Sequence, residues 1–406
     1  MRSDSTKTNK VRGVTANRRG AVPARRSILA IAVVLACAGN AHAVEVASGG
    51  DWTLDVGGFV NAYYTTGRCS GDIVNGAALA SRGLGCSGED SRTTIGNGLL
   101  PSALVTKFKT TQEGYEIGGQ VSIMVHTATT SSIGANSDVD VRQAFFTIGT
   151  PEMGTFKLGR DYGIFGSAAI LGDMTLLGVG APVSATQRGR VSLGHIGAGY
   201  HYLGHYGQIA YSTPAFDSGF GFTGALVSPV DNGGDYVSKS NPQLQGQFNF
   251  GSGPFKAWVG GKTQRFYAAS GAPEELDDFT MSAAEIGASV SAGAFGLLAN
   301  FQTGKGLGVL DDGDTGDVKV NHWIVQGTFN ASDKLKFGLN YGITKNDDDA
   351  ADIGAVKSNA NATLGAYYSI TKSVTLVAEL SRTESKDFED NEARLNGASF
   401  GGIIFF

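Results

Sequence analysis

Apolar and polar residues alternate along most of the chain, in segments separated by glycine-rich or acidic stretches. The last segment shows this most clearly. Ala398, Phe400, Gly402, Ile404 and Phe406 share one parity, so a strand at 395–406 has one apolar face and ends on an aromatic residue. In a soluble domain such a terminal strand would fray and expose an edge. In a transmembrane barrel it pairs with the first strand, and its aromatic end lies at the membrane interface.

Short turns and long loops alternate through the second half of the chain. The short turns lie at 251–254, 292–293, 331–334 and 371–372, and the acidic or polar loops at 274–278, 311–314, 347–349 and 386–392. This spacing also resembles that of β-propeller blades, but each blade needs four short strands. Here each repeat holds two segments of about 10–12 residues, the length of a tilted strand that crosses a bilayer. The pattern therefore favours an outer-membrane barrel over a propeller.

The whole pattern predicts an all-β fold, a transmembrane antiparallel β-barrel of sixteen strands, an even number as single-chain bacterial barrels require. A further hairpin between 161 and 205 would give eighteen. The predicted strands are 51–65, 99–110, 115–127, 139–149, 154–161, 205–213, 219–228, 242–250, 255–266, 281–291, 294–304, 320–330, 335–345, 359–370, 373–384 and 395–406.

The N-terminal 43 residues have the pattern of a secretory signal peptide. Basic residues at Arg25 and Arg26 precede an apolar run from Ile28 to Cys37, and Ala41-His42-Ala43 is an A-x-A cleavage site. Residues 1–43 are therefore predicted to be removed, leaving the barrel in 44–406. A lipoprotein box ending at Cys37 and a twin-arginine signal are the less favoured interpretations.

Removal of this segment changes the charge balance. Of the 32 Lys and Arg and 37 Asp and Glu, eight bases and one acid lie in residues 1–43, so the mature chain keeps 24 bases and 36 acids. A net charge near −12 argues against a nucleic-acid binder, which would be basic. The mature chain keeps two cysteines, Cys69 and Cys86, which are expected to form a disulfide in an oxidising periplasm.

Basic residues concentrate in one sector of the predicted wall, on the strands between 99 and 161. Lys107 and Lys109 share a face opposite Phe108, and Lys157 lies opposite Phe156 and Leu158. A charge that faced lipid at mid-depth would cost about 2–4 kcal/mol, so these side chains are expected at the lumen or the rim. The sector comprises Lys107, Lys109, Arg142, Lys157 and Arg160.

The alternation breaks after Arg160, in a long stretch that is too apolar for a solvated loop and too irregular for a strand. A long loop in a compact protein is usually functional, and this one is expected to fold into the lumen. Asp161 and Asp173 would then face the basic sector and set a transverse field at the narrowest point, with Arg188 and Arg190 extending the basic side. Asp173 has an alternative role as the cap of a short helix.

Two stretches resemble a known family. VRQAFFTIGTPEMGTFKLGRDYG at 141–163 looks like the signature of Gram-negative general porins, and IAYSTPAFDSGFGF at 209–222 is similar to the hairpin after their third loop. The resemblance implies a homotrimeric diffusion pore in the outer membrane of a Gram-negative bacterium, with the third loop as its constriction. Arg142 and Arg160 match the family's basic positions, the acidic role falls to Asp161 or Asp173, and Phe406 resembles the signal read by the barrel-assembly machinery. The third loop has fewer acids than the family pattern, so the sign of ion selectivity stays open.

The leading hypothesis is therefore a water-filled channel for small hydrophilic solutes and ions that is not an enzyme and uses no cofactor or metal. A substrate-selective porin for oligosaccharides or organic acids is the second hypothesis; a plugged barrel and an outer-membrane hydrolase are weaker ones. His195, His201 and His205 would hold a metal only if a turn brought them together, and Asp311 to Asp317 lacks the ligand order of a calcium loop. The acidic outer loops are better explained by contact with lipopolysaccharide and its divalent cations. Tyrosines such as Tyr63, Tyr64, Tyr200, Tyr202 and Tyr206 would suit either a sugar-binding track or the aromatic belts.

Overall fold

A computed structural model describes residues 44–129, 132–133, 139–183, 192–232, 234–273, 276–347 and 356–406. The predicted signal peptide lies outside the described residues, and so do Arg188 and Arg190.

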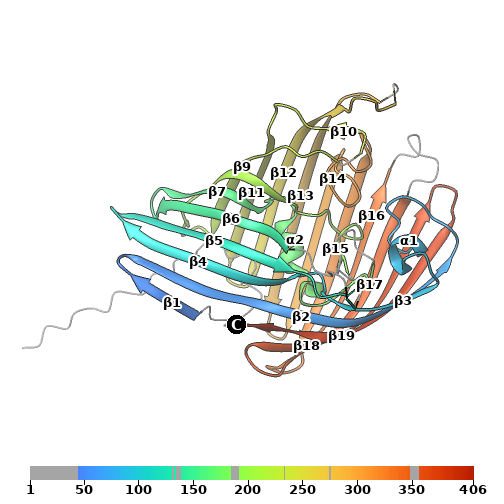
Figure 1. Cartoon of the computed structure of the whole chain (residues 1–406), viewed down its shortest axis with the longest axis horizontal. Coiled ribbons are helices and arrows are strands. Elements are labelled where there is room, and N and C mark those ends of the chain that lie inside the picture. The colour runs from blue at the N-terminus through green and yellow to red at the C-terminus, as the bar shows by residue number, and fades with distance from the viewer. Residues whose placement is uncertain are drawn as a thin grey trace, which may run out of the picture.

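Sixteen antiparallel strands close into a barrel, which confirms the predicted fold class and strand number (Figure 1). The ring closes between the first and last wall strands, where Phe405 pairs with Phe59 and Phe406 exchanges two backbone hydrogen bonds with Gly58, at 2.9 and 3.0 Å. The wall strands are β2 (Trp52–Gly71), β4 (Ser102–Gln112), β5 (Tyr115–Val125), β6 (Val139–Thr150), β7 (Gly154–Tyr162), β8 (His205–Ser212), β9 (Phe220–Val227), β11 (Gln243–Ser252), β12 (Phe255–Ala268), β13 (Phe279–Ala292), β14 (Phe295–Lys305), β15 (Lys319–Asn330), β16 (Leu335–Asn346), β17 (Val356–Ser369), β18 (Val374–Asp387) and β19 (Glu392–Phe405).

Three short strands add to this wall: β1 (Val44–Gly49), β3 (Ser91–Gly96) and β10 (Tyr236–Val237). β3 and β4 pair with successive parts of the same strand, β2, so together they form one wall strand that is interrupted at 97–101. The described residues between β7 and β8 form the helix α2 (Ser167–Gly172) and the 3-10 helix η1 (Met174–Leu177) rather than a further hairpin.

Short turns and long loops alternate around the barrel, as predicted, and define its short-turn end and its long-loop end. The turn between β4 and β5 shows why two residues are enough to connect neighbouring strands at the short-turn end. Glu113 and Gly114 have φ angles of 51° and 86°, the left-handed pair of a type I′ hairpin turn, whose twist matches that of the two strands.

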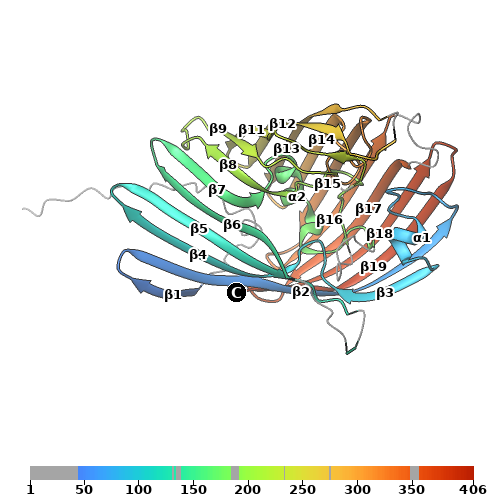
Figure 2. The ribbon, with the colours of Figure 1, turned by 45° about the horizontal axis from the view of Figure 1, so that its top comes forward.

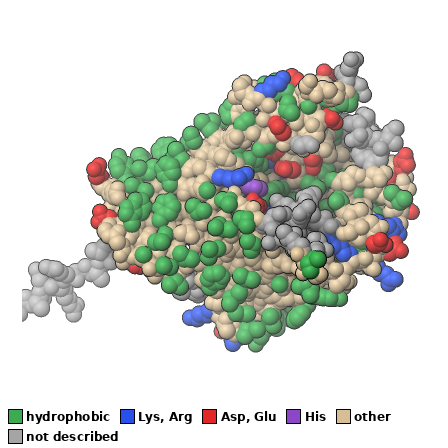
Figure 3. Space-filling model, in the orientation of Figure 1, with side chains coloured by type: hydrophobic (Ala, Val, Ile, Leu, Met, Phe, Trp, Pro, Cys, Tyr) green, Lys and Arg blue, Asp and Glu red, His purple; other side chains and the backbone are tan. Residues whose placement is uncertain are grey.

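The outer face of the wall is apolar because alternate residues point away from the lumen. On β14, Leu297 is 60% exposed whereas its neighbour Leu298 is 5% exposed. Figure 3 shows hydrophobic side chains over much of the wall. Toward the short-turn end, aromatic rings pair across strands, as Phe220 does with Phe250 and Phe295 with Phe329, at centroid distances of 4.7 and 5.0 Å. This is the pattern expected of a lipid-facing band with an aromatic girdle.

Three of the long loops, the first, third and sixth, fold inward and supply the largest hydrophobic cluster among the described residues. The third loop (163–204) carries α2, which lies inside the ring of strands in both views (Figures 1 and 2). Its Ile170 and Tyr200 pack in one cluster with Leu79 of the first loop and Val309 of the sixth loop (306–318). No described helix is long and apolar enough to cross a membrane.

The first loop (72–90) is tied to the wall by a disulfide. Cys69, near the end of β2, is bonded to Cys86, the last residue of the helix α1 (Arg82–Cys86), with a Cα–Cα distance of 6.3 Å. Ser81 caps α1, because its hydroxyl accepts a hydrogen bond from the Leu84 amide at 3.2 Å.

Candidate functional site

The third loop lies against the inner face of β11 to β18, and the wall holds it through its backbone. Gln245 accepts hydrogen bonds from the amides of Ile164 and Phe165 at 2.7 and 3.1 Å. At the next bend, Glu379 accepts from Val179 and Gly180 at 2.8 and 2.9 Å. We call the five Gln and Glu side chains of the wall that accept hydrogen bonds from amides of this loop the wall clamp; they are Gln245, Glu285, Gln302, Gln326 and Glu379.

The clamp residues occupy inward-facing positions of the wall strands, and they are needed there because the backbone amides of a buried loop must find hydrogen-bond acceptors. A buried N–H without a partner costs about 1–3 kcal/mol, so an irregular loop inside a barrel needs acceptors from the wall. Each clamp side chain is buried and provides one. Sequence reasoning missed these residues, although their signal was present as Gln or Glu at inward positions between apolar outward neighbours.

Asp173 does not face the basic sector, so the prediction that it opposes that sector is wrong. Its carboxylate accepts hydrogen bonds from the Thr175 amide at 2.9 Å, the Tyr200 hydroxyl at 2.7 Å and the Asn340 amide group at 3.0 Å, and it contacts His195 Nδ1 at 3.1 Å. Burial alone would raise the pKa of Asp173, but His195 and the hydrogen bonds hold it below its ordinary value. Asp173 caps η1 and fixes the two arms of the third loop to each other and to β16.

Asp161 is paired within its own strand. Its carboxylate lies 2.5 Å from the Lys157 ammonium and accepts a hydrogen bond from Gln143 at 2.9 Å. Gly159 lies between them at a φ of 129°, where an added Cβ would come within 2.4 Å of the Ala144 carbonyl oxygen. A side chain at 159 would therefore collide with β6, and past this glycine Lys157 reaches Asp161 along the wall, where the two charges neutralise each other locally.

Arg142 enters the interior because the wall is irregular beside it. Between the pairs Ser122–Gln143 and Met124–Asp140, β6 has one residue more than β5, which is a β-bulge. The bulge turns Arg142 inward next to Gln143, and Arg142 is only 2% exposed. Its guanidinium pairs with Asp140 at 2.6 Å and donates to the Tyr202 hydroxyl at 3.5 Å.

The remaining basic residues lie elsewhere. Arg160 shares the outward parity of Phe156 and is exposed, so its predicted place at the constriction is wrong. Lys107 and Lys109 share the parity of the buried Val105 and lie near the short-turn end, where Lys109 pairs with Asp55 at 3.4 Å. Arg188 and Arg190 lie outside the described residues.

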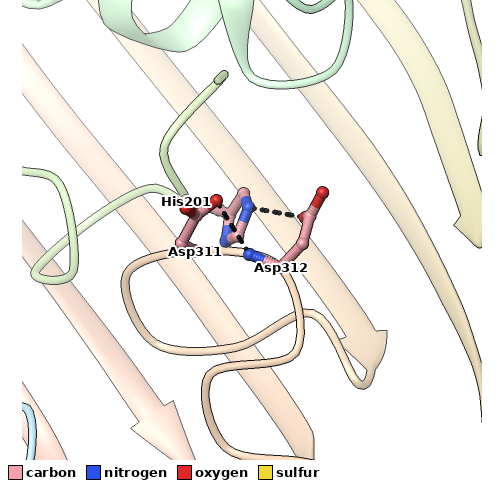
Figure 4. Close-up of side chains that lie close together, drawn as sticks. All are labelled: His201, Asp311 and Asp312. Atoms are coloured by element: carbon pink, nitrogen blue, oxygen red, sulfur yellow. Dashed lines mark hydrogen bonds and ion pairs between the residues drawn. The ribbon is translucent and has the colours of Figure 1, made fainter. Parts of the chain in front are cut away.

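A second polar cluster joins the third and sixth loops (Figure 4). His201 Nε2 lies 3.0 Å from an oxygen of Asp312, which also pairs with the Lys262 ammonium of β12. Asp311 lies beside them, and its potential ligand atoms and those of His201 and Asp312 are within 4.8 Å of one another. The three histidines considered in the sequence do not converge, because His195 contacts Asp173 instead.

The tyrosines do not form one track along the lumen. Tyr63, Tyr200 and Tyr206 are buried at 5% exposure or less, whereas Tyr64 is 49% exposed on the outer face. An apolar pocket lies beside the third loop instead, and Arg142 is its charged member. It is lined by Leu99, Leu100, Pro101, Arg142, Tyr162, Ile170, Leu171, Leu176, Tyr202 and Leu203.

Comparison with known proteins agrees with this architecture. A family model described as Gram-negative porin matches residues 30–387. The outer membrane channel DcaP of Acinetobacter baumannii is similar in structure, with a TM-score of 0.65 and 17% identity over 89% of this chain and 100% of that one. An anion-selective porin from Comamonas acidovorans gives 0.63 and 18% over 87% and 100%. OmpT of Vibrio cholerae, in a structure described as its trimer form, gives 0.52 and 16% over 88% and 100%.

No curated protein sequence matches the chain. At these identities the structural likeness shows the fold, and the family match covers most of the chain. The chain therefore belongs to the Gram-negative porins, channel-forming β-barrels of the outer membrane.

Proposed function

We propose that this porin is a passive channel for small hydrophilic solutes whose passage is limited mainly by size. The observation that carries the proposal is the third loop, held inside the barrel by the wall clamp at positions spread from β11 to β18. Such a loop narrows the lumen and stays in place, as a size filter requires. No covalent step is involved.

The charges near the loop support only a weak preference for one sign of ion. Arg142 is paired with Asp140, and Lys157 with Asp161, so neither base faces a bare acid across the lumen. The transverse field expected from the sequence is therefore weakened, because each of these bases forms a local ion pair with a neighbouring acid on the same side of the barrel. Arg142 lies beside the third loop through its bond to Tyr202, and it is the base expected to act on passing anions.

The test is single-channel current in a planar bilayer under a salt gradient. Wild-type protein should conduct with a reversal potential close to zero. Arg142→Gln should move that potential toward cation preference, while Arg160→Gln, on the outer face, should leave it unchanged. A correctly folded barrel without conductance would overturn the proposal, as would an equal shift from both variants.

The same preparation tests the assembly and the absence of catalysis. We propose a homotrimer, supported by the family match and by the trimer form described for the Vibrio cholerae relative. Conductance steps in groups of three and a trimer mass after cross-linking are expected. A serine-directed activity probe should not label the protein, because the side-chain hydrogen-bond partners of His195 and His201 among the described residues are Thr175, Asp173, Asn340 and Asp312 and include no serine hydroxyl.

A second candidate function, selection of organic acids, is favoured by the pocket beside Arg142. Its wall is almost entirely apolar, and one guanidinium lies in it, which complements a carboxylate on an apolar body. Block of the current by benzoate that is lost in Arg142→Gln would support it. Equal current in the presence of benzoate and chloride would leave size filtering as the function.

A further inference from the structure

The sixth loop reaches across the interior of the barrel. It follows β14, yet Asp312 accepts a hydrogen bond from the Tyr206 hydroxyl of β8 at 3.3 Å and another from Gln243 of β11 at 2.9 Å. The wall order is β8, β9, β11, β12, β13, β14, so the loop contacts a strand five positions away around the ring. A loop with such contacts covers part of the long-loop end instead of extending into solvent.

Hydrogen bonds within the sixth loop already define its shape, apart from its contacts with the wall. The Asp314 carboxylate accepts hydrogen bonds from the amides of Val309 and Leu310, both at 2.7 Å. The Leu310 carbonyl then accepts from the Tyr202 amide of the third loop at 3.2 Å. The sixth loop is therefore a compact unit that lies on the third loop.

Two contacts, one from the wall and one from a neighbouring loop, hold the flanks of this unit. His322 of β15 contacts the Gly308 carbonyl through Nε2 at 3.1 Å. Asn232, in the connection between β9 and β11, donates to the Gly313 carbonyl at 2.9 Å. Each is a neutral hydrogen bond, of the kind that contributes about 0.5–1.5 kcal/mol, so neither alone fixes the loop.

The strongest contact lies at the centre. Lys262 of β12 pairs with Asp312, and the side chains of both residues are 1% exposed or less. His201 of the third loop bonds to the same carboxylate oxygen, and its side chain is fully buried. One acid of the sixth loop thus joins the wall, through Lys262, and the third loop, through His201; Figure 4 shows the contact with His201.

The cluster is a fixed link rather than a metal site. His201, Asp311 and Asp312 have suitable donor atoms. Both oxygens of Asp312, however, already accept hydrogen bonds from protein donors, and the Lys262 ammonium supplies the positive charge that a metal would bring. A cation would have to displace Lys262 and leave that ammonium buried without a partner, which is strongly unfavourable.

We propose that Lys262, Asp312 and His201 form a latch that holds the sixth loop over the mouth of the channel and thereby limits the size of the solutes that enter. The latch rests on the proposed size-filtering channel and adds a second filter outside the third loop. Loops at a barrel mouth are ordinarily mobile. A buried ion pair that bridges loop and wall removes that mobility, because opening would expose one charge and strand the other.

The test compares Lys262→Met with Lys305→Met in the purified full-length protein. Lys305 pairs with Asp317 in the connection after β14 at 2.6 Å, but this pair is exposed, at 62% and 39%, and contributes little. Hydrogen exchange of peptides covering 306–318 reports loop opening directly. Loss of one partner of a buried pair should accelerate this exchange about 10²-fold to 10⁴-fold in Lys262→Met. Lys305→Met should exchange like wild type.

Liposome swelling with sugars of increasing size then reports the filter. The largest sugar that enters should increase for Lys262→Met and not for Lys305→Met. The double variant Lys262→Met/Asp312→Asn removes both charges, so it should fold even if the single variant does not, and its loop should also open. Unchanged exchange in either folded variant would overturn the latch, and faster exchange with an unchanged sugar limit would overturn its role in entry. Wild-type swelling separately tests the channel itself.

Discussion

Glu379 is the clamp residue whose removal should most disturb the third loop. Its carboxylate accepts hydrogen bonds from the amides of Val179 and Gly180 at 2.8 and 2.9 Å and from the Tyr367 hydroxyl at 2.7 Å. In Glu379→Ala, three buried donors lose their acceptor; at about 1–2 kcal/mol each, the lower part of the range for an unsatisfied buried group, the loop is destabilised by about 3–6 kcal/mol. At 1.36 kcal/mol per tenfold change, local opening should become about 10²-fold to 10⁴-fold more frequent.

Hydrogen exchange of a peptide covering 174–183 measures that opening, and bilayer recordings should show a flickering, larger current. Glu379→Gln is the conservative partner, because its amide oxygen can accept from both backbone amides while its NH₂ donates to the Tyr367 hydroxyl. Its exchange should stay near wild type. Glu384→Ala is the matched control, an acid on the outward face of the same strand paired with Arg382. If a folded Glu379→Ala barrel kept wild-type protection in this peptide, the clamp would not be what holds the loop.

Three further predictions concern the latch, the first loop and closure of the barrel. Burial and the Lys262 charge hold the pKa of His201 below its ordinary value, so His201 stays neutral while the sixth loop is closed. Because His201 can take up a proton more readily once the loop opens, closure of the loop should weaken as pH falls below about 6.5. Hydrogen exchange of 306–318, corrected for intrinsic rates, should therefore be faster at pH 5 than at pH 7. A His201→Gln variant that kept the same pH response would contradict this. Cys69→Ser/Cys86→Ser should lose about 2–4 kcal/mol of loop stabilisation and be cut faster by protease within 72–90, and reduction of the wild type should reproduce the effect. Deletion of Phe406 removes its two backbone bonds to Gly58 and should lower the yield of heat-modifiable barrel in cells, whereas Phe400→Ala, on the outer face, should not.

The strands of the wall were predictable because the alternation of apolar and polar residues that defines them is a local property of the sequence. Alternation and turn residues identify each strand wherever one face meets lipid, as for Leu297 and Leu298, and the alternation of short and long connections then sets the topology. The same rule places Arg160 on the outer face with Phe156, a consequence of parity that the prediction for Arg160 did not follow.

The site was less predictable because it depends on irregularities and long-range partners. The inward turn of Arg142 comes from one additional residue in β6, which is visible only in the pairing with β5. Asp173 is bonded to Asn340, distant in sequence, and Asp312 to Lys262, so neither acid could be assigned a partner from spacing alone. Short-range patterns carry the strands, whereas loop placement is decided by contacts between distant segments.

The clamp holds the third loop by its peptide groups, and this has an evolutionary consequence. Amides are common to every residue except proline, so the loop side chains that neither pack in the hydrophobic cluster nor bond to Asp173 or Asp312 are free to change while Gln245 and Glu379 keep its path. Mutations at those positions can then change which solutes pass without releasing the third loop from the wall. Because the wall holds the loop by its backbone, those loop side chains could also be replaced by design without changes to the barrel strands.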